Sequence, residues 1–373
     1  MKNNLDIYTD KLSLLVLLVG TFKLIYFKNI RIFFYTKSYN LFFFEKFFKK
    51  KFKFINLSKF EEARIFINKK TLFSSIWEEI DNFYDKIIDK NEFKYVSNYK
   101  VDKKKIDHSK FTGFFKESSI YLMYYGIKLF LVSKKFSKNN EVFFILKKGP
   151  FNSSLKKIYN INILSYIDIN FYYKKKYELI YYEYYLKFYF FTRLKVFQLL
   201  YFSLKDFILG FCSKKSTNQE SRVFLEVHQR EINLENITDL FWLKFSSPLK
   251  KNVLAVLYKD YDQNSINNLK KNNINFKNHK NLHVSFFSFL KIIKFYFLIV
   301  FNLLSLNLAK WKKVSIYLYL IKTQYWYEIF KNENARIFFT MTDTDDNKFC
   351  KLNAIELNQG ISVTCHWSRF PFC

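Results

Sequence analysis

The sequence predicts an α/β protein made of two doubly wound, Rossmann-like domains. Short β-rich runs alternate with longer helical stretches along almost the whole chain. One strand–turn–helix–strand unit in the first half is typical of a parallel crossover, and the alternation resumes after a polar break. At 373 residues, the chain is long enough for about two domains of ordinary size.

The first domain is predicted over residues 1–211. Its most regular helix lies at 74–89, where Ile76, Ile80 and Phe83 recur at helical spacing behind a pair of serines that can cap the helix. Before the crossover we also expect helices at 11–27, 41–48 and 112–133, and strands at 29–35 and 52–57.

The predicted crossover begins with a strand at 141–147, which Gly149-Pro150 ends. A short helix at 152–159 and a second strand at 161–167 follow. Two strands separated by one short helix are typical of a right-handed parallel connection.

A polar break separates the two predicted domains. Residues 174–211 are predicted to be helical, and 212–221 (CSKKSTNQES) is the most polar and least periodic stretch, which we interpret as the interdomain linker. The second domain is then 222–373. In it we expect strands at 222–228, 252–258, 274–277, 335–341 and 361–365, and helices at 236–245, 264–272, 285–309, 314–332 and 348–358, the last with Gly360 as its C′ residue.

The sequence ends a few residues after the strand at 361–365. A parallel strand needs cover on both faces, usually from a following helix. We therefore expect the second domain to be incomplete in this chain.

Composition narrows the classes of partner. The chain carries 62 Lys and Arg against 32 Asp and Glu, a formal net charge of +30, but only seven of the basic residues are Arg. Nucleic-acid readers favour Arg, so we do not expect nucleic acid as a partner. The abundance of Phe, Tyr, Asn, Ile and Lys together fits A/T-rich codon usage, and Lys runs such as 49–51 are expected to be solvated. The charge still favours peripheral contact with an anionic membrane.

Other residue types exclude further classes. Half of the residues are apolar, which excludes a disordered chain, and only six are Gly, which argues against a Gly-rich phosphate loop. Cysteines at 212, 350, 365 and 373 form no C-x-x-C pair, so we expect no disulfide framework and no zinc site, and we expect a cytoplasmic location. Apolar stretches at 12–22 and 295–309 are shorter than the roughly 18–20 residues of a spanning helix, so we expect two buried core helices.

Ligands of open parallel sheets bind beyond the carboxyl ends of the strands. His228 ends the predicted strand 222–228, and Glu226 lies two residues earlier on the same face. A carboxylate beside an imidazole can orient it for acid–base work, so we predict His228 as a catalytic base with Glu226 as its partner. Lys259 and Asp260 follow the next strand and are candidate substrate ligands. A structural, half-exposed histidine is the alternative for His228.

The loop after strand 335–341 (TMTDTDDN) is the most acidic strand end. Asp and Thr there can cap the helix that follows, since its amino terminus favours negative charge. Alternatively, Asp343 can position a catalytic water while Thr342 and Asp345 bind sugar hydroxyls. His366 and Ser368 follow the last strand and are further candidate ligands. His279 and His283 lie four residues apart in a polar stretch and are expected to face solvent, and no metal site is predicted.

The carboxyl-terminal third resembles a known family. It contains 325–337 (YWYEIFKNENARI), then the acidic loop, then 354–361 (AIELNQGI), and finally His366-Trp367-Ser368. This order resembles bacterial surface-polysaccharide and lipopolysaccharide biosynthesis proteins of glycosyltransferase-B-like architecture. In that family the position of His366 is more often Gln.

The resemblance implies two facing Rossmann-like domains with sugar transfer between them and no obligatory metal. It implies a nucleotide-sugar donor as substrate rather than a bound cofactor, and a glycan or lipid-linked acceptor. The cytoplasmic protein would then contact the inner membrane peripherally.

Two alternatives stay open from the sequence. One is a basic RNA-binding or ribosome-associated protein from an A/T-rich genome, for which steeply salt-dependent RNA binding would be the sign. The other is an integral membrane protein built around 12–26 and 286–309.

Overall fold

The computed structural model describes residues 2–37, 48–67, 69–87, 93–149, 151–166, 168–170, 181–183, 223–228, 232, 247–282, 284–305, 308, 310–340 and 348–364. The chain divides into two compact units. Unit 1 comprises Met1–Lys90 and Lys116–Phe191, and unit 2 comprises Asn91–Phe115 and Thr192–Cys373. Unit 2 therefore includes Asn91–Phe115, which the sequence-based boundary assigns to the first domain. The predicted linker at 212–221 lies outside the described residues.

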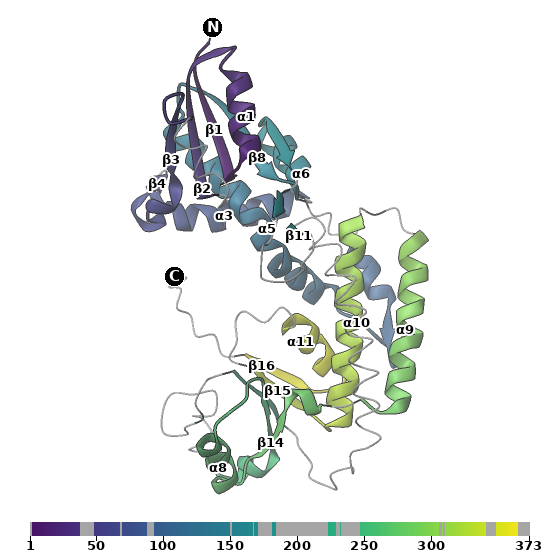
Figure 1. The fold of residues 1–373 in the computed structure, drawn as a ribbon. Helices are drawn as coiled ribbons and strands as arrows, with labels where there is room; N and C mark the ends of the chain where they lie inside the picture. The colour runs from purple at the N-terminus through teal and green to yellow at the C-terminus, as the bar shows by residue number, and fades with distance from the viewer. Residues whose placement is uncertain are drawn as a thin grey trace. The chain divides into compact units, whose positions relative to one another are not determined.

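Unit 1 is an α/β unit whose sheet is entirely parallel (Figure 1). Its strands are β1 (Lys2–Leu12), β2 (Phe27–Lys37), β3 (Phe52–Asn56), β8 (Glu141–Lys147) and β9 (Ile163–Tyr166), in the order β3-β2-β1-β8-β9. Its helices are α1 (Leu14–Lys23), α3 (Leu72–Ile87), α6 (Asn152–Tyr159) and the part of α5 (His108–Phe136) that follows Phe115.

The central strand β1 shows the alternation that buries both faces of this sheet. Leu5 and Ile7 lie in the cluster that α1 covers, while Tyr8 points to the opposite face and stacks on Phe33 with ring centroids 4.5 Å apart. The strand β1 is not predicted by the sequence pattern. Its Asp and Asn residues have low β-propensity, and the apolar run that follows them favours a helix.

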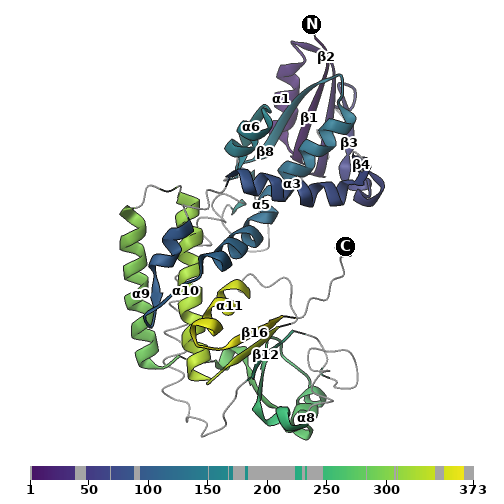
Figure 2. The same cartoon turned by 180° about the vertical axis from the view of Figure 1, so that it is seen from behind.

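Unit 2 contains a second parallel sheet (Figure 2). Its strands are β12 (Val223–Val227), β13 (Val253–Leu257), β14 (Asn275–Asn278), β15 (Ile337–Thr340) and β16 (Ile361–Thr364), in the order β14-β13-β12-β15-β16. Its helices are α8 (Gln263–Lys271), α9 (Phe286–Ser305), α10 (Lys310–Asn332), α11 (Lys348–Leu357) and the first part of α5.

Helices cover both faces of this second sheet. Val223, Leu225 and Val227 belong to the cluster that contains Leu269 of α8, whereas Phe224 packs edge-on against Phe330 of α10 at 5.0 Å. All residues of β12 and β13 are buried, as expected for central strands of a covered parallel sheet.

Both sheets share one topology. Numbered along the chain within each sheet, the strands lie in the order third, second, first, fourth, fifth, which is compatible with a Rossmann-like fold. The predicted α/β class with parallel sheets is thus confirmed, as is the crossover, because β8 and β9 pair in parallel after α6.

Short elements complete the described chain. Three small antiparallel pairs are β4 (Phe66–Ile67) with β5 (Lys70–Thr71), β6 (Lys100–Val101) with β7 (Lys104–Lys105), and β10 (Asp168–Asn170) with β11 (Tyr181–Glu183). Short 3-10 helices lie at Leu57–Lys59, Glu62–Arg64, Lys94–Asn98, Ser247–Asn252 and His279–Asn281. The helix predicted at 174–211 is wrong over Tyr181–Glu183, which pairs as a strand, and the helices predicted at 41–48 and 236–245 fall almost entirely outside the described residues.

Two sequence-based expectations need correction. The apolar helices are not buried all round: α1 exposes Leu18 and Phe22, and α9 exposes Phe301. Gly360 does not adopt the left-handed conformation, which Gln359 takes instead with φ of 62°. Glycine is required at 360 by close approach, because a Cβ there would lie 2.4 Å from the carbonyl oxygen of Arg336.

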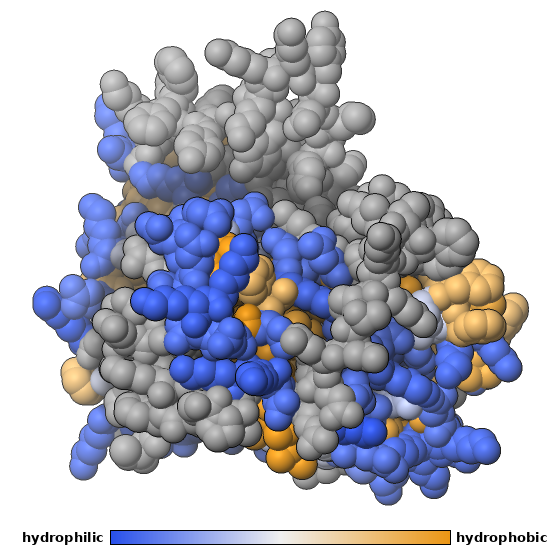
Figure 3. All heavy atoms as spheres, turned by 90° about the horizontal axis from the view of Figure 1, so that it is seen from below, coloured by the Kyte–Doolittle hydropathy of each residue, from blue (hydrophilic) through white to orange (hydrophobic). Residues whose placement is uncertain are grey.

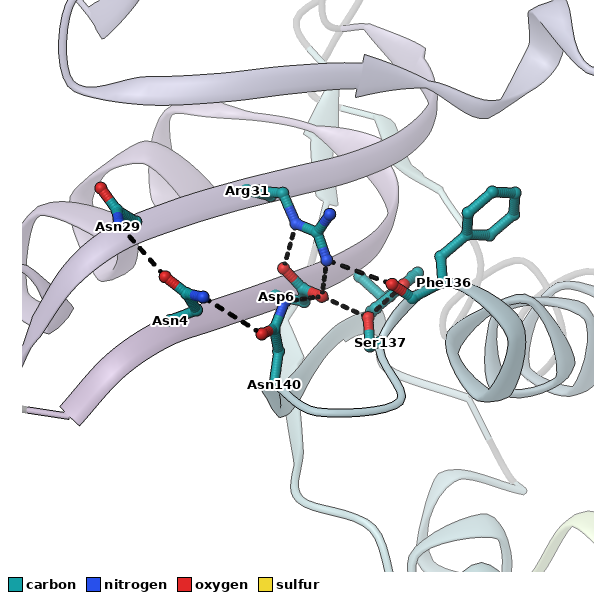
Figure 4. A network of polar contacts seen from close by, with 8 residues as sticks. Asn4, Asp6, Asn29, Arg31, Phe136, Ser137 and Asn140 are labelled. Carbon is teal, nitrogen blue, oxygen red and sulfur yellow. Dashed lines mark hydrogen bonds and ion pairs between the residues drawn. The ribbon is translucent and has the colours of Figure 1, made fainter.

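A buried carboxylate ties the strands of unit 1 together (Figure 4). Asp6 on β1 is completely buried, and Arg31, its direct register partner on β2, donates to both of its oxygens at 2.7 and 2.6 Å. Ser137 also donates to Asp6, as does Asn140 at 3.0 Å. Arg31 comes from β2, Ser137 and Asn140 come from the turn between α5 and β8, and Arg31 also donates to the carbonyl of Phe136 at 3.1 Å, so the network fixes β1, β2 and the end of α5 to one another.

Removing this carboxylate should destabilise unit 1. We expect Asp6→Ala to cost about 3 kcal/mol, since it leaves the Arg31 guanidinium without its bidentate partner in a half-buried position. Hydrogen exchange of peptides from β1 and β2 measures the change. As a control, Glu78→Ala breaks an ion pair to Lys70 whose side chains are both more than half exposed, and it should cost less than about 1 kcal/mol. Equal protection in the two variants would contradict the role of the network.

Candidate functional site

The candidate site lies at the carboxyl edge of the unit 2 sheet. Three neighbouring parallel strands each present an aromatic ring as the first residue after the strand: His228 after β12, Tyr258 after β13 and His279 after β14. Residues directly after parallel strands meet along one edge, so the topology alone places these rings in a row.

The three rings stack on one another. The His228 and Tyr258 centroids are 4.4 Å apart with an interplanar angle of 21°, and those of Tyr258 and His279 are 5.0 Å apart at the same angle. We call these three residues the ring ladder. His228 and Tyr258 are partly exposed and His279 is exposed, so the ladder offers two imidazoles and a phenol ring to the edge where ligands of such sheets bind.

Glu226 lies beneath the ladder on β12, with 1% of its side chain exposed. Lys351 of α11, equally buried, lies 2.5 Å from Glu226 Oε1, and the Tyr258 hydroxyl donates to the same oxygen at 2.5 Å. The Lys351 ammonium also lies 4.6 Å from the ring centroid of Trp326. A buried carboxylate thus holds Tyr258 in the ladder and α11 against the sheet.

The remaining carboxylate oxygen faces His228. Glu226 Oε2 is 3.9 Å from His228 Nε2, and 28% of the His228 side chain is exposed. A carboxylate on this side of the ring orients the imidazole, and the buried Nε2 faces the carboxylate while the rest of the ring is partly exposed.

The protonation of Glu226 follows from its neighbours. Burial opposes the charged form, but the Lys351 charge and the hydrogen bonds from its neighbours outweigh burial and hold the pKa of Glu226 below its ordinary value. Glu226 is therefore ionised at neutral pH and forms a buried ion pair with Lys351.

The structure brings together part of the predicted site. His228 and Glu226 lie as predicted, side by side at the end of β12. Lys259 and Asp260 follow Tyr258 in the loop to α8, and both are exposed. The remaining predicted side chains lie outside the described residues; these are Thr342, Asp343, Asp345, His366 and Ser368.

Three residues of the site were missed by sequence reasoning. Tyr258 was placed inside the strand 252–258, and the strand 274–277 was ended one residue early, so neither Tyr258 nor His279 was recognised as the residue after a strand. The expectation that His279 faces solvent is confirmed, since its side chain is exposed, and one face of its ring stacks on Tyr258. Lys351 lies between Cys350 and Ala354 on the buried side of α11, and a lysine in a helix gives no sequence signal of such burial.

Unit 1 has a cavity at the amino-terminal edge of its sheet, whereas the candidate site of unit 2 lies at the carboxyl-terminal edge. A cavity of about 770 Å³ is lined by Asn4, Asn29, Arg31 and Asn140, together with the lysines of 49–51 and Lys53. These residues lie at the amino ends of β1, β2, β3 and β8, whereas ligands of parallel sheets bind beyond the carboxyl ends. Among the ring contacts of the described residues, a row of stacked rings on consecutive strand ends occurs in unit 2, which is why we place the candidate site there.

No protein-family model, curated protein or solved structure matches the chain.

The buried ion pair gives a direct stability test. We expect Lys351→Met to destabilise unit 2 by about 3–5 kcal/mol, because Glu226 is left charged and unpaired in the core. The double variant Glu226→Gln/Lys351→Met should recover most of that loss, since no charge is then buried. Hydrogen exchange of peptides from β12 and α11 measures both. A double variant as unstable as the single one would show that packing of the lysine stem, and not charge pairing, dominates.

Acid should remove the contribution of Glu226. Because its folded-state pKa is lowered from 4.5, the carboxylate stabilises unit 2 fully above that value, and the stabilisation is lost as the pH falls below it. The difference in hydrogen-exchange protection between the natural chain and Glu226→Gln should therefore be large at pH 7 and shrink as the pH falls to about 3.

The control for this pH series is Glu356→Gln, whose side chain is 43% exposed in its pair with Lys110. It should show little difference at any pH. A difference for Glu226→Gln that stays constant from neutral to acid pH would contradict an ionised Glu226.

Proposed function

We propose that the chain is a glycosyltransferase-like protein of glycosyltransferase-B architecture in cell-surface polysaccharide assembly. It transfers a sugar from a nucleotide sugar to the hydroxyl of a glycan or lipid-linked acceptor. The observation that carries the proposal is the ring ladder above a buried, ionised Glu226 at the carboxyl edge of the unit 2 sheet. This edge is where Rossmann-like sheets bind nucleotides, and the resemblance of the carboxyl-terminal third supports the same class.

His228 is the proposed general base. Its imidazole accepts the proton of the acceptor hydroxyl while Glu226 holds the ring in position at 3.9 Å. The acceptor oxygen bonds to the anomeric carbon of the donor as the bond from that carbon to the diphosphate oxygen breaks. The sugar is thereby transferred, and the diphosphate leaves with the bonding electron pair.

Positive groups near this edge suit the departing diphosphate. Lys259 is exposed directly after Tyr258, and α11 begins at Lys348 on the carboxyl-terminal side of β15. Backbone N–H groups at a helix amino terminus bind phosphate oxygens, and the helix dipole favours their charge. In this proposal Asp343 belongs with His228 and Glu226 to the catalytic group, Thr342, Asp345, His366 and Ser368 supply polar contacts to the sugar, and no metal takes part.

A panel of nucleotide sugars tests the proposal on the purified full-length chain. We expect at least one to bind by calorimetry, and we expect His228→Ala to lower the transfer rate by about 10²–10⁴-fold while changing donor binding little. His108→Ala removes an exposed imidazole elsewhere in unit 2 and serves as the matched control. Failure of every nucleotide sugar to bind a chain with protected β12 amides would refute the proposal.

A further inference from the structure

Helix α9 of unit 2 presents an unusually apolar stripe to solvent. The side chain of Phe287 is 75% exposed and that of Phe301 is 69% exposed. In Figure 3 apolar atoms gather at the right-hand margin, where α9 is the outermost helix in Figure 1. The exposed apolar residues of α9 are Phe286, Phe287, Leu290, Phe297, Leu298 and Phe301.

These residues form one continuous face. Their spacing places them within about a third of the helix circumference, at 100° per residue, and the stripe runs along a helix of about 30 Å. The opposite face is firmly packed, since Ile292 and Ile299 are buried and Tyr296 lies edge-on to Tyr317 of α10 at 5.5 Å. The stripe is therefore the outer surface of a fixed helix.

The charges on α9 are all positive. The helix contains Lys291 and Lys294 and no Asp or Glu, and both lysines are exposed. By helical spacing Lys294 lies within the apolar stripe, whereas Lys291 lies at its border and pairs with Asp102 at 3.4 Å. This pattern sits in a chain of net charge +30. An apolar stripe with lysines in it complements a surface that is both apolar and anionic.

We propose that α9 lies flat in the interfacial layer of an anionic lipid bilayer, with its phenylalanines among the upper acyl chains and Lys294 at the lipid phosphates. A spanning orientation fits poorly. It would place Lys294 near the bilayer centre and would strip α9 from α10, which carries buried Lys322, Gln324 and Glu328. The proposal rests on the surface of unit 2 alone and stands whether or not the chain transfers sugars.

The test is co-sedimentation of the full-length chain with vesicles. We expect binding to mixed phosphatidylglycerol and phosphatidylcholine vesicles and weaker binding to phosphatidylcholine alone. Phe287→Ser/Phe301→Ser should lower the affinity by about tenfold or more, because it removes two rings from the buried stripe. Lys294→Gln should lower it about fivefold on anionic vesicles, with little effect on neutral ones.

The matched control is Phe66→Ser/Tyr95→Ser, which removes two exposed rings elsewhere and should bind as the natural chain does. Circular dichroism verifies the fold of each variant. Three results would overturn the proposal: equal binding by the α9 double variant, binding that resists alkaline carbonate as an integral protein does, or a natural chain that light scattering shows to be a dimer without lipid and that the α9 variant makes monomeric.

Discussion

The ion pair between Glu226 and Lys351 is the interaction on which the second unit depends. Two charges in a fully packed core are tolerated only when each satisfies the other. Here the pair also joins three elements, because Glu226 lies on β12, Lys351 on α11, and Tyr258, which donates to the same carboxylate oxygen, directly after β13. The ring ladder and the buried charge are therefore one structure, and the position of His228 follows from it.

Each unit has a buried acidic residue on the central strand of its sheet, and the two residues have different roles. In each, the first strand along the chain is central in the sheet and carries a fully buried acid, Asp6 on β1 and Glu226 on β12. Asp6 lies in the first half of its strand and binds Arg31 on the neighbouring strand β2. This pairing fixes the register of the two strands. Glu226 lies one residue from the end of its strand, so its charge reaches the edge where ligands of parallel sheets bind.

Much of the architecture could be predicted from periodicity, and the failures have physical causes. Buried parallel strands are continuous apolar runs, so β8, β12 and β13 were found almost to the residue. The strand β1 was not predicted. A buried Asp6 is compatible with a sheet only when Arg31 lies opposite it, and this pairing depends on the tertiary structure. Likewise, the composition of α9 shows that it is apolar but not which of its faces the protein covers.

The site was half predicted for a similar reason. His228 was predicted because ligands of parallel sheets bind after strand ends. Tyr258 and His279 were not predicted, because the ends of their strands were each placed one residue from where the structure has them. Stacking across neighbouring strands cannot be read from one strand at a time. Lys351 was hidden because a lysine in a helix is ordinarily solvent-facing, and a buried partner is needed to reverse that expectation.

The central claim is that a bound ligand contacts the ring ladder. The chain has only five histidines, so the imidazole signals of the ladder can be observed directly. With histidine-selective isotope labels, the imidazole resonances can be followed by NMR while a nucleotide sugar that binds in the calorimetry panel is titrated into the natural chain. The account predicts that the signals of His228 and His279 move together and that the signal of His108 does not. Saturable binding that leaves both ladder imidazoles unshifted would contradict it.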